Sequence, residues 1–327
     1  MSVKSGLLLM LEQHKGETIS GEFLAGELGC TRAAVWKAVK TLREEGYQIE
    51  AGPNRGYILT KENNRLSEEG IRLFLHHPDV NIQLFQELSS TNQTAKEAII
   101  RRTAGHGSIV VAESQSRGRG RMGREFFSPS GSGLYLSVIL KPAATLQDSL
   151  LLTTAAATAV YQAVKKVCGT ELDIKWVNDL YLDGKKTGGI LTEAITDFES
   201  GMIEYAVVGI GLNLTEPLGG FPDELFETAG AICRGKDGEN PPDRNRLAAE
   251  IVNALLEETR RGSLSDIYLE RNIIPGHRIQ VIDGEKSRPA SALEICPDGR
   301  LKIREKDGRI TFLNYGEVSI RTEEELI

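Results

Sequence analysis

A segment rich in glycine and arginine, GRGRMGR at 118–124, is the densest cluster of chemistry-bearing residues in the chain. The stretch from Ser114 to Arg124 has four arginines and no acidic residue, although the whole chain has a formal net charge of -7. Glycine allows a backbone to turn tightly and to present its N–H groups to an oxyanion. Arginine adds a planar fork that matches phosphate. We therefore expect this segment to hold a phosphate-bearing molecule.

The same segment matches the pattern G-x-G-x-x-G at Gly118, Gly120 and Gly123, which is a weak indication by itself. A dinucleotide-binding fold needs a helix directly after the third glycine, but the residues that follow, EFFSPSG at 125–131, are no helix start. The sequence also lacks the HRD and DFG motifs of protein kinases and the GxxxxGK[ST] motif. Loop amides and arginines are thus expected to hold the phosphates. The alternative is a solvated basic loop.

Two further motifs combine lysines with an amide, a carboxylate or glycines. KWVND at 175–179 ends a predicted strand, where Lys175, Asn178 and Asp179 can bind phosphate, polar substrate groups and a divalent cation. KKTGGIL at 185–191 places two lysines before a glycine pair, which allows a close approach of backbone. For either motif alone, the alternative is an ordinary strand end or hairpin with solvated lysines.

The elements around these motifs predict an α+β fold with a mixed sheet between about residues 65 and 271. Strand-like runs at 82–88, 108–113 and 134–140 precede a long helix at 150–167, which stops near Gly169. Strand-like segments at 172–177, 180–182, 189–194 and 204–214 follow, and then a second helix at 246–259. Because helices and strands do not alternate strictly, an α+β arrangement is favoured over a doubly wound one.

The remaining residues, 272–327, form short alternating segments separated by Asp-Gly pairs at 283–284, 298–299 and 307–308. Asp-Gly between alternating segments is a hairpin-turn signal. The C-terminal region is therefore predicted to be a small β-barrel.

Residues 1–64 predict three helices, at 5–13, 20–28 and 31–45, followed by strands at 47–51 and 57–60. The third helix has an apolar stripe on one side and cations on the other. This order is typical of a winged helix-turn-helix domain, whose third helix meets phosphates and base edges. The predicted DNA-binding residues are Thr31, Arg32, Trp36, Lys37, Lys40 and, in the hairpin turn, Arg55. The alternative is a packing or dimerisation domain with a solvated basic face.

Composition limits the class of protein. Hydrophobic residues make up 40% and charged residues 26% of the chain, which is ordinary for a soluble globular protein. No apolar run approaches the ~20 residues that span a bilayer, so no membrane association is expected. The four cysteines are far apart and have no metal-ligand spacing. A reduced, cytoplasmic protein is the predicted class.

Four segments occur in a fixed order: SSTN at 89–92, GRGRMGR at 118–124, KWVND at 175–179 and KTGGIL at 186–191. In this order they closely resemble the biotin–protein ligases. The N-terminal domain makes the chain similar to the bifunctional class, in which one chain is both ligase and biotin operon repressor. The resemblance extends over essentially all 327 residues. Lipoate ligases share the fold and a lysine but lack the arginine-rich loop.

The resemblance implies that biotin and ATP, with Mg²⁺, condense to biotinyl-5′-AMP. Biotin is then transferred to a lysine of the biotin carboxyl carrier domain of acetyl-CoA carboxylase or a related carboxylase. It implies a biotin site made of Ser90, Thr91, Asn92, Gln115, Arg119, Gly120, Arg121, Lys186 and Gly189. It implies a nucleotide site made of Arg119, Arg121, Lys175, Asn178 and Asn213. The implied catalytic residues are Lys186, Arg119, Arg121 and Asp179, with Asp179 also a candidate Mg²⁺ ligand.

These residue types fit that chemistry. A urea-like ring needs both hydrogen-bond donors and acceptors, which hydroxyls and amides supply, and cations lower the barrier between a carboxylate and a triphosphate. Two positions depart from residues that family members can carry: Met122 stands in place of arginine and Val177 in place of proline. Met122 leaves the loop with one cation fewer.

The resemblance also implies a homodimer that forms with biotinyl-5′-AMP bound and recognises operator DNA. Two other functions stay open at this point. One is a ligand-sensing transcription factor without ligase turnover. The other is a ligase whose N-terminal domain does not bind DNA.

Overall fold

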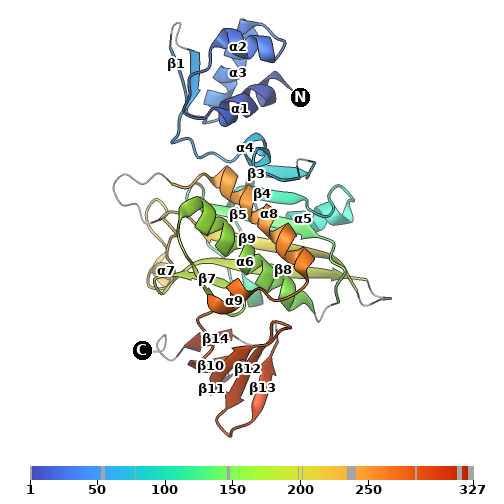
Figure 1. Ribbon diagram of the computed structural model, residues 1–327. Helices are drawn as coiled ribbons and strands as arrows, with labels where there is room; N and C mark the ends of the chain where they lie inside the picture. Colours follow the sequence, from blue (N-terminus) through green and yellow to red (C-terminus); the bar gives the residue numbers. More distant parts are fainter. Residues whose placement is uncertain are drawn as a thin grey trace. The chain divides into compact units, whose positions relative to one another are not determined.

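The structure, a computed structural model, describes residues 2–52, 56–77, 79–145, 148–197, 199–200, 202–233, 241–283, 286–314 and 319–322. The chain divides into two compact units (Figure 1), one of Met1–Asp79 with Gly235–Glu250 and one of Val80–Arg234 with Ile251–Ile327. The predicted domain ranges 1–64, 65–271 and 272–327 do not coincide with these units and remain predictions.

The first unit begins with a winged helix-turn-helix, as predicted. Helices α1 (Val3–Gln13), α2 (Gly21–Glu27) and α3 (Arg32–Glu44) precede the antiparallel hairpin of β1 (Ile49–Gly52) and β2 (Gly56–Leu59). Each helix starts at a hydroxyl that accepts a backbone N–H in the first turn, and the caps are Ser2, Ser20 and Thr31. The apolar side of α3 packs into one buried cluster with leucines of α1, α2 and β2.

A short helix, α4 (Glu68–Arg72), and the start of α8 (Arg244–Arg261) complete the first unit. The Arg244 guanidinium donates twice to the Asn64 carbonyl, over 2.9 and 2.7 Å. The Asn245 side chain accepts the Ser67 N–H over 2.9 Å and donates to the Arg65 carbonyl over 3.0 Å. Arg244 and Asn245 are both buried. The segment after the hairpin is therefore fastened to the first turn of α8.

A seven-stranded sheet forms the centre of the second unit, in the order β3-β4-β5-β9-β8-β7-β6. Its strands are β3 (Ile82–Leu88), β4 (Ile109–Gln115), β5 (Gly133–Leu140), β6 (Asp173–Lys175), β7 (Asp179–Leu182), β8 (Lys185–Thr196) and β9 (Ile203–Asn213). The β3–β4 pair is parallel and the other pairs are antiparallel. The predicted mixed sheet is thus confirmed.

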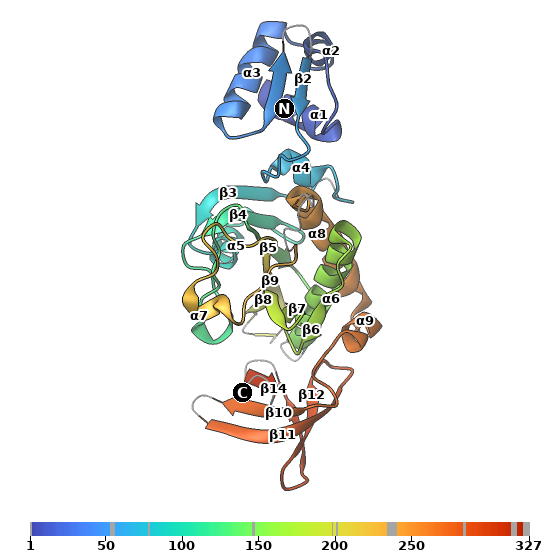
Figure 2. The same cartoon turned by 90° about the vertical axis from the view of Figure 1, so that its left-hand side faces the viewer.

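Two helices cover opposite faces of this sheet (Figure 2). The long helix α6 (Ser149–Cys168) meets one face, where the Thr153 hydroxyl donates to Thr192 of β8 over 2.8 Å. Helix α5 (Thr91–Ile100) contacts the next residue of β8, Glu193. Since successive strand residues point to opposite faces, α5 and α6 lie on opposite sides. As predicted, α6 stops at Gly169, whose φ of 68° is left-handed.

Several short helices were not predicted: α4, α5, α7 (Asp223–Phe226) and α9 (Asp266–Glu270). With few turns, each gives too short an apolar periodicity to recognise. The omission of α5 matters most, because the predicted SSTN motif at 89–92 contains its N-cap, Ser90, and its first two residues.

The C-terminal strands are β10 (Arg278–Asp283), β11 (Lys286–Ile295), β12 (Leu301–Glu305), β13 (Ile310–Leu313) and β14 (Ser319–Thr322). They form an antiparallel sheet in the order β13-β12-β11-β10-β14. In the described part of the chain no pairing joins β13 to β14, so the predicted small barrel is an open sheet there. The turns at Gly299 and Gly308 have φ of 84° and 86°, as the Asp-Gly pairs predicted.

Candidate active site

The first turn of α5 holds three of the predicted biotin residues. Ser90, Thr91 and Asn92 are all buried. The side-chain oxygen of Gln115, at the end of β4, accepts the Thr91 N–H over 2.9 Å. The parallel pairing of β3 with β4 brings the ends of both strands together, which explains why segments about 25 residues apart meet here.

The arginine-rich loop is folded back on itself after β4. Gln115 N–H donates to Ser128 O over 3.0 Å, Phe126 N–H to Gly118 O over 2.9 Å and Gly120 N–H to Arg124 O over 2.7 Å. A Cβ on Gly118 would lie 2.2 Å from the Phe126 carbonyl oxygen, so only glycine fits there. Beside the loop is a cavity of about 310 Å³ lined by Gln115, Ser116, Arg117, Gly118, Glu125, Phe126, Phe127, Ser128, Pro222, Glu224 and Leu225.

Four predicted site residues from three segments form one continuous hydrogen-bonded chain, which we call the Arg121–Lys186 chain. Arg121 Nη1 donates to Asn178 Oδ1 over 2.9 Å. Asn178 Nδ2 donates to Asp179 Oδ1 over 3.1 Å, and Lys186 Nζ donates to the same oxygen over 2.7 Å. The loop, the strand-end motif and the lysine motif are therefore brought together, as the sequence predicted.

Three other predicted residues lie beside this chain in different ways. A Cβ on Gly189 would lie 3.5 Å from both Asp179 Oδ1 and Lys186 Cε. Asn213 Nδ2 donates to Gly230 O over 3.1 Å, and Gly230 N–H donates to Lys186 O over 2.9 Å. Lys175 is buried, with Nζ 5.2 Å from the ring centre of Tyr181.

Two buried aromatic residues hold the KWVND motif and were missed by sequence reasoning. The Tyr268 hydroxyl, from α9, donates to the Val177 carbonyl over 2.9 Å. Trp176 Nε1 donates to the Gly299 carbonyl, in a hairpin turn of the C-terminal sheet, over 2.8 Å. The peptide bond between Trp176 and Val177 is cis. No sequence signal pairs these residues, because each partner is about 90 or more positions away.

Other residues of the site are the exposed Arg119 and the half-buried Gly120. Arg119 forms a β-bridge with Glu125 at the base of the loop. Neither residue belongs to the Arg121–Lys186 chain.

A metal site does not follow from protein ligands alone. Among the described residues no group of three or more histidine, cysteine, aspartate or glutamate side chains could hold an ion. Asp179 Oδ1 already accepts bonds from Lys186 and Asn178. Mg²⁺ usually takes one or two carboxylates and completes its shell with water and substrate phosphates, so Asp179 suits a single contact of that kind.

The predicted DNA-binding residues on α3 share its exposed side. Arg32, Trp36, Lys37 and Lys40 are exposed, and Trp36 is 60% exposed. Lys40 lies 6.0 Å from the Trp36 ring centre and 3.8 Å from Glu44. Thr31 is the N-cap of α3 and accepts the Ala34 N–H over 3.2 Å. Arg55 lies outside the described residues.

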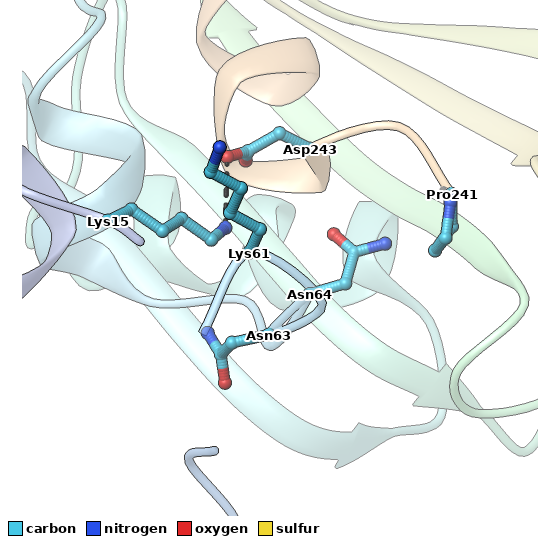
Figure 3. A pocket seen from close by; sticks show the side chains of 6 residues that line it. All are labelled: Lys15, Lys61, Asn63, Asn64, Pro241 and Asp243. Atoms are coloured by element: carbon cyan, nitrogen blue, oxygen red, sulfur yellow. Dashed lines mark hydrogen bonds and ion pairs between the residues drawn. The ribbon is translucent and has the colours of Figure 1, made fainter. Parts of the chain in front are cut away.

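A second cavity, of about 140 Å³, lies within the first unit (Figure 3) and is lined by Lys15, Lys61, Asn63, Asn64, Pro241 and Asp243. None of the predicted site residues lines it. Lys15 Nζ is 3.1 Å from Asp243 Oδ2, so the charge of this lysine is already matched. Of the described helices, none is long and apolar enough to cross a membrane.

Comparison with known proteins gives two family matches. Residues 84–213 match the profile of the biotin/lipoate A/B protein ligase family. Residues 4–58 match that of an HTH domain. Both matches fall on the segments whose geometry is described above.

Curated relatives cover most of the chain. The bifunctional ligase/repressor BirA of Bacillus subtilis is 40% identical over 235 residues, 71% of this chain and 71% of its own length. The protein of the same name from Escherichia coli is 33% identical over 321 residues, 94% of this chain and 95% of its own. Among solved structures, the biotin protein ligase from Aquifex aeolicus in complex with biotin and ATP has a TM-score of 0.60 and 25% identity. It covers 74% of this chain and 99% of its own.

Proposed function

The chain belongs to the biotin–protein ligases of the bifunctional ligase/repressor class, and we propose that the Arg121–Lys186 chain is where it joins biotin to ATP. The protein is an ATP-dependent ligase that forms biotinyl-5′-AMP and transfers biotin to a carrier protein, and it is also a transcriptional repressor. The observation that carries the site proposal is the continuous bonding from the loop through Asn178 and Asp179 to Lys186.

Adenylation joins two anions, and the cations of the site make that approach possible. A carboxylate oxygen of biotin forms a bond to the α-phosphorus of ATP while the bond from that phosphorus to the pyrophosphate oxygen breaks. Lys186 and Arg121 stabilise the negative charge that gathers on the phosphoryl oxygens in the transition state. Because Asp179 and Asn178 already hold both cations, little reorganisation is needed when the charge develops.

Transfer needs no nucleophile from the protein, because the mixed anhydride is itself the activated species. The amine of the carrier lysine attacks the acyl carbon, the bond to the AMP oxygen breaks, AMP leaves with its electron pair, and the new amide nitrogen loses a proton to solvent. We propose that Lys186 remains next to the acyl phosphate through both steps and balances the charge of the departing AMP.

The arginine-rich loop and the start of α7 are placed to exclude water from the intermediate. The arginine-rich loop and the segment containing Pro222 and Leu225 line the same cavity. Closing them over the anhydride would protect it from hydrolysis. We assign Arg119, whose side chain is exposed, to the nucleotide.

ATP, biotin and Mg²⁺ are the small molecules of the reaction. Mg²⁺, when bound, neutralises phosphate charge. Asp179 is the carboxylate that would hold it, in keeping with the single contact that its bonding allows. Lys175 and Asn213 are assigned to the nucleotide, and Ser90, Thr91 and Gln115 to the biotin ring.

The repressor function rests on the winged helix-turn-helix, which binds operator DNA. We propose that biotinyl-5′-AMP is the corepressor, that it favours a homodimer, and that two α3 helices then meet two half-sites. We also propose acetyl-CoA carboxylase or a related carboxylase as the carrier and the cytoplasm as the location. Four free cysteines fit a reducing compartment.

The test incubates the full chain with biotin, ATP and Mg²⁺, and measures pyrophosphate release. A biotin carboxyl carrier domain is then added, and labelled carrier is measured. Release followed by transfer is expected. Biotin binding without pyrophosphate release would replace the proposal with a ligand-sensing transcription factor. Normal ligation without operator binding at low salt, with the adenylate present, would leave a ligase alone.

A further inference from the structure

The biotin side of the site contains polar residues that the sequence did not single out, one of them buried and two partly exposed. Ser137 of β5 is completely buried and lies 2.6 Å from Asn92 Oδ1 and 2.7 Å from Thr91 Oγ1. Glu193 of β8 lies 2.8 Å from Asn92 Nδ2, and Lys96 of α5 lies 2.8 Å from Glu193. These contacts link the Glu193 carboxylate to the Thr91 hydroxyl through two side chains, those of Asn92 and Ser137.

The direction of each hydrogen bond in this group can be assigned, starting at the carboxylate. Burial raises the pKa of Glu193, but hydrogen bonds from Lys96 and Asn92, together with the positive charges of Lys96 and Arg119, outweigh it and hold that pKa below its ordinary value. Glu193 is therefore ionised and can only accept. The carbonyl of Leu191, 3.1 Å from the same amide, can also only accept. The N–H₂ group of Asn92 must face both of them.

This orientation leaves the Asn92 carbonyl oxygen facing Ser137. An amide oxygen can only accept a hydrogen bond, so the Ser137 hydroxyl donates its single proton to Asn92 Oδ1. Two oxygens 2.7 Å apart need a proton between them, and Ser137 has none left for Thr91. Because Ser137 Oγ cannot donate to both Asn92 and Thr91, we assign the proton of the 2.7 Å contact to the Thr91 hydroxyl.

The other neighbour of Thr91 is oriented by backbone groups. Gln115 Oε1 accepts the Thr91 N–H, and Gln115 Nε2 donates to Ser128 Oγ over 3.0 Å. Ser128 in turn donates to the Phe126 carbonyl over 2.9 Å. With the Thr91 proton assigned to the shorter contact with Ser137, none is left for the 3.2 Å approach of Thr91 Oγ1 to Gln115 Oε1, which then brings two acceptors together. A ligand N–H placed at these two oxygens would relieve their repulsion.

We propose that Glu193, acting through Asn92 and Ser137, makes the Thr91 hydroxyl an acceptor toward bound biotin, so that the site selects a ring N–H at that point. The inference rests on the proposed function, in which the biotin ring lies against Thr91 and Gln115. Glu193, Asn92 and Ser137 are positioning residues in this scheme. The Asn92 amide packs directly against Gly209 of β9, because a Cβ at that position would lie 2.2 Å from Asn92 Oδ1.

The test uses biotin and its two cyclic carbamate analogues, each with one ring N–H replaced by oxygen. Binding to the full chain is measured by calorimetry without ATP. One carbamate places a ring oxygen against Thr91, where it meets two acceptors. The wild-type protein should bind that isomer about 10- to 100-fold more weakly than biotin, since an unmatched buried polar group has a cost of this order.

Ser137→Ala releases the Thr91 proton, which can then turn toward the ligand. In this variant the affinity for that carbamate, relative to the affinity for biotin, should rise about tenfold. The relative affinity for the other isomer should not change. Thr192→Ala is the matched control, because it also removes a buried hydroxyl, one that accepts a hydrogen bond from Thr153 on the opposite face of the same sheet. In Thr192→Ala, the affinity of each carbamate relative to biotin should equal that of the wild type.

A second variant, Thr91→Val, removes the acceptor while Ser137 still donates to Asn92. The discrimination between biotin and the affected carbamate should fall at least tenfold. General damage to the fold would weaken the binding of all three ligands alike and leave the ratios of their affinities unchanged. Unchanged ratios in both variants, with biotin bound normally by the wild type, would overturn the inference. A wild-type protein that binds no biotin would overturn the proposed function instead.

Discussion

The two surfaces that we propose for ligation and for DNA binding use charged side chains in contrasting ways. On α3 the cations are exposed, and the closest partner of Lys40 is a carboxylate 3.8 Å away. In the Arg121–Lys186 chain each side chain is bonded to the next over 2.7 to 3.1 Å. The DNA surface attracts a long polyanion, and binding there depends mainly on the charge of the phosphates. The ligase site instead needs hydrogen-bond donors that are already in position before negative charge develops in the transition state. Single substitutions should therefore be mild on α3 and severe in the site.

The largest effect is expected from Lys186→Ala. Removing a placed donor of this kind lowers the rate by about 10²- to 10³-fold, so pyrophosphate release should fall by that factor. Lys185→Ala is the control, because Lys185 Nζ bonds to the Phe226 carbonyl and lies outside the Arg121–Lys186 chain. Its rate should change by less than about threefold. Equal losses of pyrophosphate release in Lys186→Ala and Lys185→Ala would show that the Arg121–Lys186 chain is no more sensitive than its surroundings.

The first unit contains a buried carboxyl group, Glu12, and the next largest effect is expected there. Burial raises the pKa of Glu12 from 4.5 to about 7, against the opposing charge of Lys15 and with Asp243 and Glu69 adding to the increase. The folded state thus holds the proton more tightly than the unfolded state. This contribution to stability is complete below pH 4.5 and is lost as pH rises through about 7, which corresponds to about 3 kcal/mol.

Glu12→Gln should remove this pH dependence. Hydrogen exchange of α1 amides, measured from pH 5 to 8 and corrected for the intrinsic rate, would report the free energy of opening. The exposed Glu50 supplies the control variant, Glu50→Gln. If wild-type protection does not decline relative to Glu12→Gln between pH 5 and 8, the carboxyl is not held in its neutral form.

A smaller effect is expected where the site is supported from outside. Tyr268→Phe leaves the Val177 carbonyl without its hydroxyl donor, which should cost about 1 to 3 kcal/mol. Because Val177 precedes Asn178, the rate of adenylation should fall while operator affinity stays unchanged. Tyr205→Phe keeps its ring near Lys141 and should leave both unchanged. A loss confined to stability, with a normal rate, would show that the motif does not need this support.

The smallest effect is expected on α3. Lys40→Ala should lower the slope of log affinity against log salt by about 1 and weaken operator binding alike across sequences. Lys4→Ala, on α1, removes a lysine paired with Glu45 and should leave the slope unchanged. A large, sequence-dependent loss at Lys40 would mean that the exposed surface is organised as tightly as the ligase site.

Much of the fold followed from local patterns. The helices at 5–13, 20–28 and 31–45 appear as α1, α2 and α3 within a few residues, because their N-caps and apolar stripes are local signals. The short α5 was missed for lack of such periodicity. Met122, noted as a departure, adopts a φ of 56° in the loop.

The sequence alone determined which chemical groups are present and the order in which they come. Glycines, arginines, lysines and one asparagine–aspartate pair are distinctive enough in GRGRMGR, KWVND and KTGGIL to identify the chemistry. Only the tertiary structure decided how those groups are held. Ser137 and Glu193 lie 45 and 101 positions from Asn92, and a lone serine or glutamate has no distinguishing pattern. The sheet brings these two residues to Asn92, and the surrounding acceptors then fix which group donates in each hydrogen bond.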